Sequence, residues 1–214
     1  MTPEEALESI SAFVGDAQDA LAVTVASRLS PWATLLSTVA SLRTRDETCA
    51  VVTPRLVAAA PGPRALDALT LQEVQDLLYP SSFYCAKAVH LKSIARTILD
   101  DFGGEVPETM EGLLTLKGIG RKSAALVLTL GFGKPAVCVD THVHRLSNRL
   151  GFVKTETPAE TERALMQVLP ERWWIPQNGV LIAFGRSVCH PTSPKCSECP
   201  VAASCPRAGV TRSR

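Results

Sequence analysis

Residues 113–122 read LLTLKGIGRK, and this stretch decides how the rest of the chain is interpreted. The pattern predicts a short helix, a turn in which Gly118 and Gly120 flank the apolar Ile119, and a new helix that begins near Arg121. Glycines let backbone N–H groups come close to a ligand, and the amides at a helix start favour an anion such as a phosphate. The stretch therefore fits a sequence-independent grip on DNA. The alternative is an ordinary helix-turn-helix corner whose glycines serve only the turn.

Lys122 falls in the first turn of the second predicted helix. An amine presented there can attack a carbonyl-like carbon and form a Schiff base, which is a recognised route of covalent catalysis. The alternative is a solvated lysine without a chemical role.

Asp140 is expected to return to the neighbourhood of this lysine. A helix over residues 121–131 would run about 15 Å at 1.5 Å per residue. Residues 136–139, if extended, are long enough to bring the chain back to where that helix begins. Because Asp140 precedes Thr141 and another predicted helix, it also fits a helix N-cap, and both roles can hold at once.

Four of the seven cysteines lie close together in the spacing C-x6-C-x2-C-x5-C: Cys189, Cys196, Cys199 and Cys205. In a reducing compartment such a group favours metal ligation over disulfides. Spacing alone leaves structural zinc and an iron-sulfur cluster both open. The three scattered cysteines, Cys49, Cys85 and Cys138, are expected to be core residues.

Length and composition exclude several classes of protein. The 214 residues are 46% hydrophobic and 20% charged, which predicts a packed chain of one large domain or two small ones. The longest nearly apolar stretch, residues 124–130, is far short of the roughly 20 residues that cross a bilayer. Residues 1–10 carry three acids and no base, unlike a leader, so a cytoplasmic protein is expected, associated with the bacterial nucleoid when bound to DNA.

Charge is unevenly distributed along the chain. Residues 117–149 hold six bases against one acid, although the net charge of the whole chain is +1. This segment could face a polyanion, or it could be a solvated basic face.

Helix signals are dense and strand signals nearly absent, so the expected fold class is all-α. Helix N-caps are predicted at Ser30, Thr70, Ser82, Asp140 and Thr157. Ser82 would start a helix over residues 83–101 that Gly103 and Gly104 end. Pro54, inside an otherwise helical run, predicts a break or kink.

The segments LKGIGRKSA (116–124) and VDTHVHRLSNR (139–149), followed by the four-cysteine tail, resemble the endonuclease III family of helix-hairpin-helix DNA glycosylases. The resemblance covers about residues 29–206, and the motifs occur in the expected order. It implies a two-lobed all-α protein with a DNA-binding cleft between the lobes. A six-helix barrel containing the helix-hairpin-helix would span residues 24–134, and residues 1–23 and 135–214 would form the iron-sulfur cluster domain.

The resemblance also implies roles for particular residues. Lys122 matches the family's Schiff-base lysine and Asp140 its aspartate, while the ligands of a [4Fe-4S] cluster would be Cys189, Cys196, Cys199 and Cys205. The implied activity is that of a bifunctional DNA glycosylase and AP lyase of base excision repair. It would remove oxidised pyrimidines from a flipped-out nucleotide through a lysine Schiff base and nick the strand by β-elimination.

The expected partner is double-stranded DNA that contains damaged pyrimidines or abasic sites. The protein is expected to be a monomer and not to associate with a membrane. Two other interpretations remain. One is a monofunctional glycosylase, or one of altered specificity. The other is a non-catalytic DNA-binding protein with a metal-stapled tail.

Three positions depart from the family pattern or replace its DNA contacts. Lys117 stands where the hairpin usually has proline, and residues 37–46 lack the glutamine that fills the gap left by the flipped base, so Leu42 or Arg43 is expected to fill it. Phe83 falls at the position of the intercalating wedge, the alternative being a buried aromatic at a helix start. The expected DNA-binding residues are thus Leu116, Lys117, Gly118, Ile119, Gly120, Arg121, Leu42, Arg43, Phe83 and His142.

Overall fold

The computed structural model describes residues 1–15 and 29–214. Every regular element within those ranges is a helix, which confirms the all-α fold class. Across the same ranges, none of the helices combines the length and the apolar character needed to span a bilayer. The chain divides into two compact units, Met1–Val25 with Pro135–Arg214 and Ala26–Lys134.

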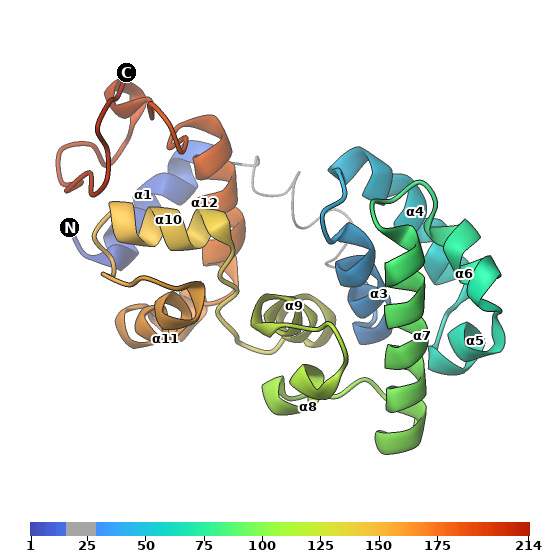
Figure 1. The fold of residues 1–214 in the computed structure, drawn as a ribbon. Helices are drawn as coiled ribbons and strands as arrows, with labels where there is room; N and C mark the ends of the chain where they lie inside the picture. Colours follow the sequence, from blue (N-terminus) through green and yellow to red (C-terminus); the bar gives the residue numbers. More distant parts are fainter. Residues whose placement is uncertain (16–28) are drawn as a thin grey trace. The chain divides into compact units, whose positions relative to one another are not determined.

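The unit Ala26–Lys134 is built around α3, most of whose side chains are buried. Its helices are α3 (Pro31–Ser41), α4 (Asp46–Ala59), α5 (Pro63–Ala68), α6 (Leu71–Leu78), α7 (Tyr84–Asp101), α8 (Met110–Thr115), α9 (Arg121–Leu126) and the π-helical turn η3 (Val127–Gly131). Helices α4 and α7 and the turn η3 pack against α3, and α5 and α6 pack against α7 (Figure 1). The pair α8 and α9 forms a helical hairpin, and α9 runs directly into η3.

Predicted helix boundaries are confirmed where their signals are local. The Ser30 hydroxyl accepts a hydrogen bond from the backbone N–H of Ala33 at 3.2 Å, so Ser30 caps α3 as expected. Helix α7 ends before Gly103 and Gly104, whose φ angles of 62° and 94° lie in the left-handed region that glycine adopts readily. Reciprocal capping boxes close three N-termini: Thr2 with Glu5 at α1, Thr70 with Glu73 at α6, and Thr157 with Glu160 at α11.

Two boundaries differ from the predictions. Of the break or kink predicted at Pro54, the break is absent, because α4 continues through Pro54. Both Pro54 and Ala50, the residue one turn earlier whose carbonyl loses its partner, are exposed, so water can hydrate that carbonyl. Ser82 does not cap α7 either, because Phe83 intervenes in a left-handed conformation (φ 58°).

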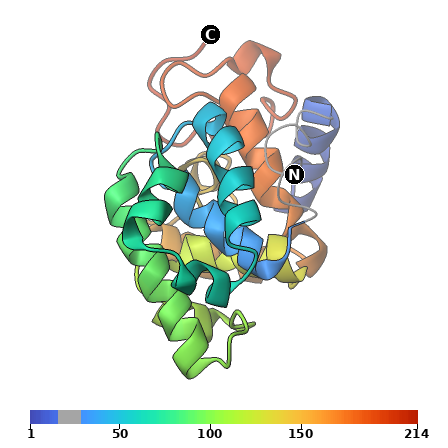
Figure 2. The same ribbon diagram turned by 90° about the vertical axis from the view of Figure 1, so that its right-hand side faces the viewer.

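The second unit combines the N-terminal helix with the C-terminal part of the chain. Its helices are α1 (Pro3–Val14), α10 (Thr141–Arg149), α11 (Pro158–Val168), η4 (Glu171–Trp173), α12 (Pro176–Ser187) and η5 (Cys196–Glu198). Helix α12 packs against both α1 and α10, and α11 packs against α10. Helices α1 and α12 lie side by side in both views (Figure 1 and Figure 2).

Helices α10 and α12 approach closely at Gly185. A Cβ atom at this position would lie 2.4 Å from Nδ1 of His142 and 3.0 Å from Nη2 of Arg145. A larger residue there would force the side chains of His142 and Arg145 to move, because protein interiors are close-packed. Helix α10, which begins directly after Asp140, is therefore closely packed on α12 at this point.

Candidate active site and cysteine centre

The turn between α8 and α9 has the geometry that the sequence predicts. The N–H of Ile119 donates to the carbonyl of Leu116 at 3.0 Å, and both side chains are buried. Lys117, Gly118 and Gly120 are exposed. The two apolar side chains therefore anchor the turn in the unit, and any contact that Leu116 or Ile119 makes with DNA must come from the backbone.

The two glycines of this turn serve different purposes. Gly118 has φ 82°, and a Cβ atom there would lie 3.4 Å from the ring of His90 on α7, so the turn itself requires this glycine. Gly120 has φ −97°, and a Cβ atom there would meet nothing within 4 Å. At Gly120 the missing side chain therefore leaves an open approach to the backbone at the start of α9.

Lys122 is exposed in the first turn of α9. The next two residues, Ser123 and Ala124, are buried, and the N–H of Ala124 donates to the carbonyl of Gly120 at 2.9 Å. The backbone below the lysine is therefore fixed while its side chain faces outward.

Asp140 is the N-cap of α10, as the sequence predicts. Its Oδ1 accepts hydrogen bonds from the backbone N–H groups of His142 and Val143, both at 2.9 Å. The carbonyl of Cys138, two residues earlier, accepts from the side-chain amides of Gln177 at 3.1 Å and Asn178 at 3.2 Å. The segment that carries the carboxylate is thus held at both ends. Asp140 and Lys122 belong to different units.

The half-buried side chain of His142 faces α12. Its Nδ1 lies 3.4 Å from Nη2 of Arg145, and its ring occupies the space above Gly185. Its backbone amide is already engaged by the carboxylate of Asp140.

Three further residues of the expected DNA contact lie in two turns of the unit Ala26–Lys134. The side chain of Phe83 is 63% exposed, so the alternative of a buried aromatic is wrong. The guanidinium of Arg43 lies over its ring, 5.8 Å from the centroid, and Leu42 is also exposed. Leu42, Arg43 and Phe83 therefore come from one place on the surface of this unit.

The four clustered cysteines, here called the cysteine centre, line one small cavity of about 20 Å³. Among the described residues, no group of three or more His, Cys, Asp or Glu side chains has the geometry to hold a metal ion. Burial raises the pKa of the Cys199 and Cys205 thiols, repulsion from the neighbouring cysteines adds to this, and backbone N–H donors oppose it. One such donor, the N–H of Arg207, lies 3.4 Å from Sγ of Cys205.

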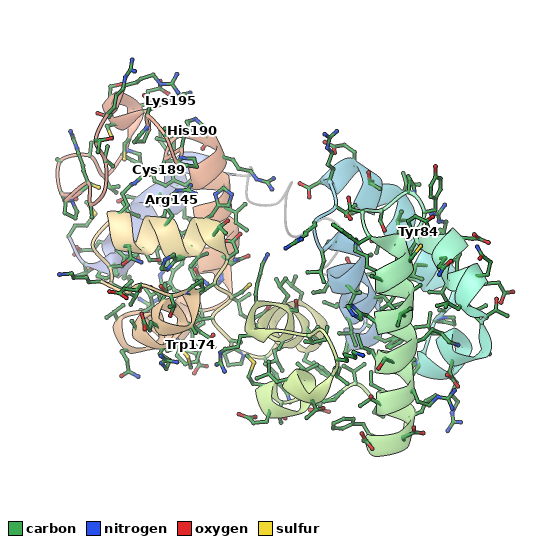
Figure 3. The ribbon with its side chains drawn as sticks, in the orientation of Figure 1. Tyr84, Arg145, Trp174, Cys189, His190 and Lys195 are labelled. Atoms are coloured by element: carbon green, nitrogen blue, oxygen red, sulfur yellow. The ribbon has the colours of Figure 1, made fainter. Side chains whose placement is uncertain are left out.

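Arg149, although charged, is buried beside this cavity. Its Nη1 donates to Sγ of Cys189 at 3.5 Å and to the carbonyl of His190 at 2.7 Å, and its Nη2 donates to the carbonyl of Pro191 at 3.0 Å. Nη2 of Arg145 donates to the carbonyl of Cys189 at 3.1 Å. The labelled side chains of Arg145 and Cys189 lie in the same part of the unit as His190 and Lys195 (Figure 3).

The buried position of Arg149 was not predicted, because in the sequence it counts only as one charge of the basic segment 117–149. Its register could have predicted burial, because Arg149 lies three residues after Leu146 and six after Val143, on the apolar side of α10. A charged side chain in that register needs buried partners, which the cysteine loop provides.

The helical hairpin, the capped aspartate and the cysteine centre together define a class of protein. Residues 36–171 match the family described as HhH-GPD superfamily base excision DNA repair protein. The chain is 47% identical to endonuclease III of Thermotoga maritima over 169 residues, which cover 79% of each chain. It is 41% identical to endonuclease III of Synechocystis sp. over 180 residues, which cover 84% of this chain and 82% of that protein.

A solved structure of a trapped endonuclease III–DNA covalent intermediate has a similar fold. The TM-score is 0.83 at 31% identity, over 95% of this chain and 94% of that chain. The chain therefore belongs to the endonuclease III family within the HhH-GPD superfamily. It is a base excision repair enzyme, a DNA glycosylase and AP lyase.

Proposed function

We propose that Lys122 is the nucleophile of this glycosylase and lyase, and that the bases it removes are oxidised pyrimidines in double-stranded DNA. The observation that carries the assignment is the exposure of Lys122 in the first turn of α9, directly after the open backbone at Gly120. Backbone N–H groups at the start of α9 that bind a DNA phosphate would bring the adjoining sugar to the amine of Lys122.

The hairpin grips the DNA backbone without reading its sequence. The exposed side chains of Lys117 and Arg121 supply positive charge on either side of the turn, and the exposed backbone of Gly118 and Gly120 allows close approach. Contacts of this kind fix the position of the strand and make binding dependent on salt concentration.

The damaged nucleotide leaves the base stack before reaction, because its C1′ is inaccessible in the duplex. The lone pair on Nζ of Lys122 then forms a bond to C1′, and the glycosidic C–N bond breaks so that the base leaves with its electron pair. Opening of the sugar gives an imine. Loss of a C2′ proton and breakage of the C3′–O bond expel the 3′ phosphate and nick the strand.

Asp140 supports this reaction as a carboxylate. It takes the proton that Lys122 must lose, or stabilises positive charge that develops on the sugar, or both. Its two bonds from backbone N–H groups hold it in one orientation while it does so.

The cysteine centre fits an iron-sulfur cluster of the [4Fe-4S] type. Four thiol groups are available around one cavity, and N–H donors from Arg149 and Arg207 point at two of the sulfur atoms. Cys189, Cys196, Cys199 and Cys205 would hold the cluster, which when bound supplies iron–thiolate bonds that cross-link the loop. The loop between the first two ligands, with Lys195, would then be held ready for DNA phosphates.

The nucleophile is tested by borohydride trapping on a duplex with an abasic site. The wild-type protein is expected to form a covalent adduct, and Lys122→Ala is expected to form none. The matched control is Lys134→Ala, which removes an exposed lysine that pairs with Glu108 in the same unit and should trap normally. An adduct of Lys122→Ala at the wild-type level would assign the nucleophile elsewhere.

Substrate range and assembly need separate measurements. Duplexes that carry an oxidised pyrimidine, an oxidised purine or an abasic site are compared as substrates, and the first and third are expected to be cleaved. We also propose a monomer that acts in the cytoplasm on nucleoid DNA. Sedimentation of the enzyme with and without DNA tests its oligomeric state.

A further inference from the structure

Two turns in the unit Ala26–Lys134 present exposed side chains from strained backbone. Arg43, between α3 and α4, has φ 52°, and Phe83, directly before α7, has φ 58°. Residues with a Cβ atom adopt such angles rarely, and they persist only where surrounding contacts hold them. The guanidinium of Arg43 lies over the ring of Phe83. The two turns therefore form one joint feature, here called the Arg43–Phe83 tip.

Lys87 is the buried residue that joins these turns. It lies one turn into α7, only 4% of its surface is exposed, and its backbone N–H donates to the carbonyl of Phe83 at 3.0 Å. Its Nζ donates to the carbonyl of Ala40, at 2.6 Å, and to Oγ1 of Thr44, at 2.7 Å. A single side chain on α7 thus reaches both the end of α3 and the turn that carries Arg43.

Thr44 completes the junction with one hydroxyl group. Its Oγ1 accepts from Nζ of Lys87 and, at 3.2 Å, from the backbone N–H of Ser82, and it donates to the carbonyl of Leu42 at 3.3 Å. A hydroxyl has one proton and two lone pairs, so these contacts use its full capacity. The carbonyl before Arg43 and the amide before Phe83 are thereby fixed to the same atom.

A lysine is a costly choice for this purpose. Burial lowers the pKa of Lys87, because desolvation disfavours the ammonium form, and the nearby Cys49 opposes this only partly. An apolar side chain would fill the site without that cost, but it could not donate to two oxygen atoms from different turns. What the lysine supplies is therefore orientation of the turns.

We propose that Lys87 and Thr44 are positioning residues that hold Arg43 and Phe83 as a single rigid tip against the base stack of the bound duplex. The inference rests on the proposed action on duplex DNA and extends it to residues that do not touch the nucleic acid. A fixed tip penetrates a base step at a set position relative to the hairpin, whereas two independently mobile turns would not.

The chain offers a matched control on the same helix. Nζ of Lys92 also donates to backbone carbonyl oxygens, at 2.6 Å to Asp67, 2.6 Å to Leu69 and 3.3 Å to Leu66. These contacts join α7 to the end of α5 and do not involve the Arg43–Phe83 tip. Lys92→Met therefore removes a similar lysine without moving the tip.

The experiment compares Lys87→Met, Thr44→Val, Thr44→Ser and Lys92→Met with the wild-type protein, below the unfolding temperature of each. Base removal from a lesion-containing duplex is expected to fall about 10- to 100-fold for Lys87→Met and Thr44→Val, as for small misplacements of positioning groups. The hydroxyl of Thr44→Ser should restore most of the rate, and Lys92→Met should keep it. Fluorescence of 2-aminopurine beside the lesion reports unstacking and should fall in step with the rate.

Borohydride trapping on a single-stranded abasic oligonucleotide separates this inference from the proposed chemistry, because no base stack has to be opened. All four variants should trap like the wild-type protein there; if the wild-type protein does not trap at all, the chemistry assigned to Lys122 is wrong. In a Phe83→Ala background, the addition of Lys87→Met should lower the rate of base removal little further, because the effects of substitutions in residues that act as a unit are not additive. Undiminished base removal by Lys87→Met and Thr44→Val, or losses that multiply with Phe83→Ala, would overturn the positioning role.

Discussion

At the scale of single residues, Asp140 carries two functions that substitutions can separate. As an N-cap it needs an oxygen that accepts from the N–H groups of His142 and Val143, and asparagine provides one almost as well. In the proposed reaction it needs a negative charge, which asparagine lacks. Replacement of Asp140 by asparagine should therefore preserve the cap of α10 but impair the reaction.

Asp140→Asn is expected to lower the rate of base removal about 10²-fold or more, because charge and proton acceptance are lost. Its free energy of unfolding should stay close to the wild-type value. Asp140→Ala should lose activity and also about 1 kcal/mol of stability through the missing cap. Single-turnover kinetics and urea unfolding of both variants measure the two effects. Thr157→Ala removes a cap from α11 in the same unit and should reduce stability but leave the rate unchanged; a wild-type rate for Asp140→Asn would refute the proposed role.

Residue roles could be predicted from the sequence where a motif states the chemistry. The positions of Lys122 in the first turn of α9 and of Asp140 at the N-cap of α10 follow from the sequence and are confirmed. The roles of both residues and of the four cysteines come from the family resemblance and stay proposals. The contacts of Lys87 and Arg149 do not follow from the sequence, because their partners are turns far away along the chain. Lys87 lies on the apolar side of α7, four residues before the buried Leu91, but periodicity cannot say which oxygen atoms a buried lysine will meet.

At the scale of elements, the same distinction between local and distant causes explains which boundaries were predictable. Capping boxes involve residues three apart, so Thr70 with Glu73 could be predicted from the sequence alone. The left-handed turn at Phe83 follows Ser82, whose N–H donates to the hydroxyl of Thr44, 38 residues before Ser82. The π-helical turn η3 likewise ends where Gly131 meets Pro31, and a Cβ atom there would lie 2.8 Å from Cα of Pro31.

The capping box of α6 should give the protein a pH-dependent term in its stability. Hydrogen bonds from the side chain and backbone of Thr70 lower the pKa of Glu73 below its ordinary value of 4.5. A carboxyl whose pKa is depressed by folding stabilises the native state above the ordinary value, and this contribution is lost as pH falls through the folded pKa. The stability difference between the wild-type protein and Glu73→Gln should therefore be largest near neutral pH and narrow below about pH 4.5.

Urea unfolding followed by helical circular dichroism at pH 7, 5 and 3 measures this difference. Thr70→Val removes the hydroxyl that makes the leading contribution and serves as the control background. In that background, the effect of Glu73→Gln on the free energy of unfolding should vary much less with pH. An unchanged variation in that background would mean that the carboxylate is stabilised by something other than the box.

At the scale of the whole molecule, the two units have their own cores and their own tryptophans. Trp32 is buried in the unit Ala26–Lys134, and its indole N–H donates to the carbonyl of Ala60 at 2.8 Å. Trp173 and Trp174 pack against the core of the other unit, together with Cys199 and Cys205. Fluorescence from these tryptophans can therefore follow the units separately, and only one unit shares its core with the cysteine centre.

Loss of the proposed cluster should accordingly destabilise one unit selectively. Without iron, the four thiols and the loop held by Arg149 lose their cross-link, while Trp32 belongs to the unit that does not contain these cysteines. We expect oxidative removal of iron, or Cys199→Ser, to lower the unfolding midpoint reported by Trp173 and Trp174 by at least about 5 °C, about 1 kcal/mol for a unit of this size. The midpoint of the unit with the cysteine centre is read in a Trp32→Phe protein, and that of the other unit from Trp32 in a protein with Trp173→Phe and Trp174→Phe. Cys49→Ser is the control that removes a cysteine from the unit Ala26–Lys134. Equal shifts of both units would show that they unfold as one, and no shift at all would mean that the four cysteines hold nothing that the fold needs.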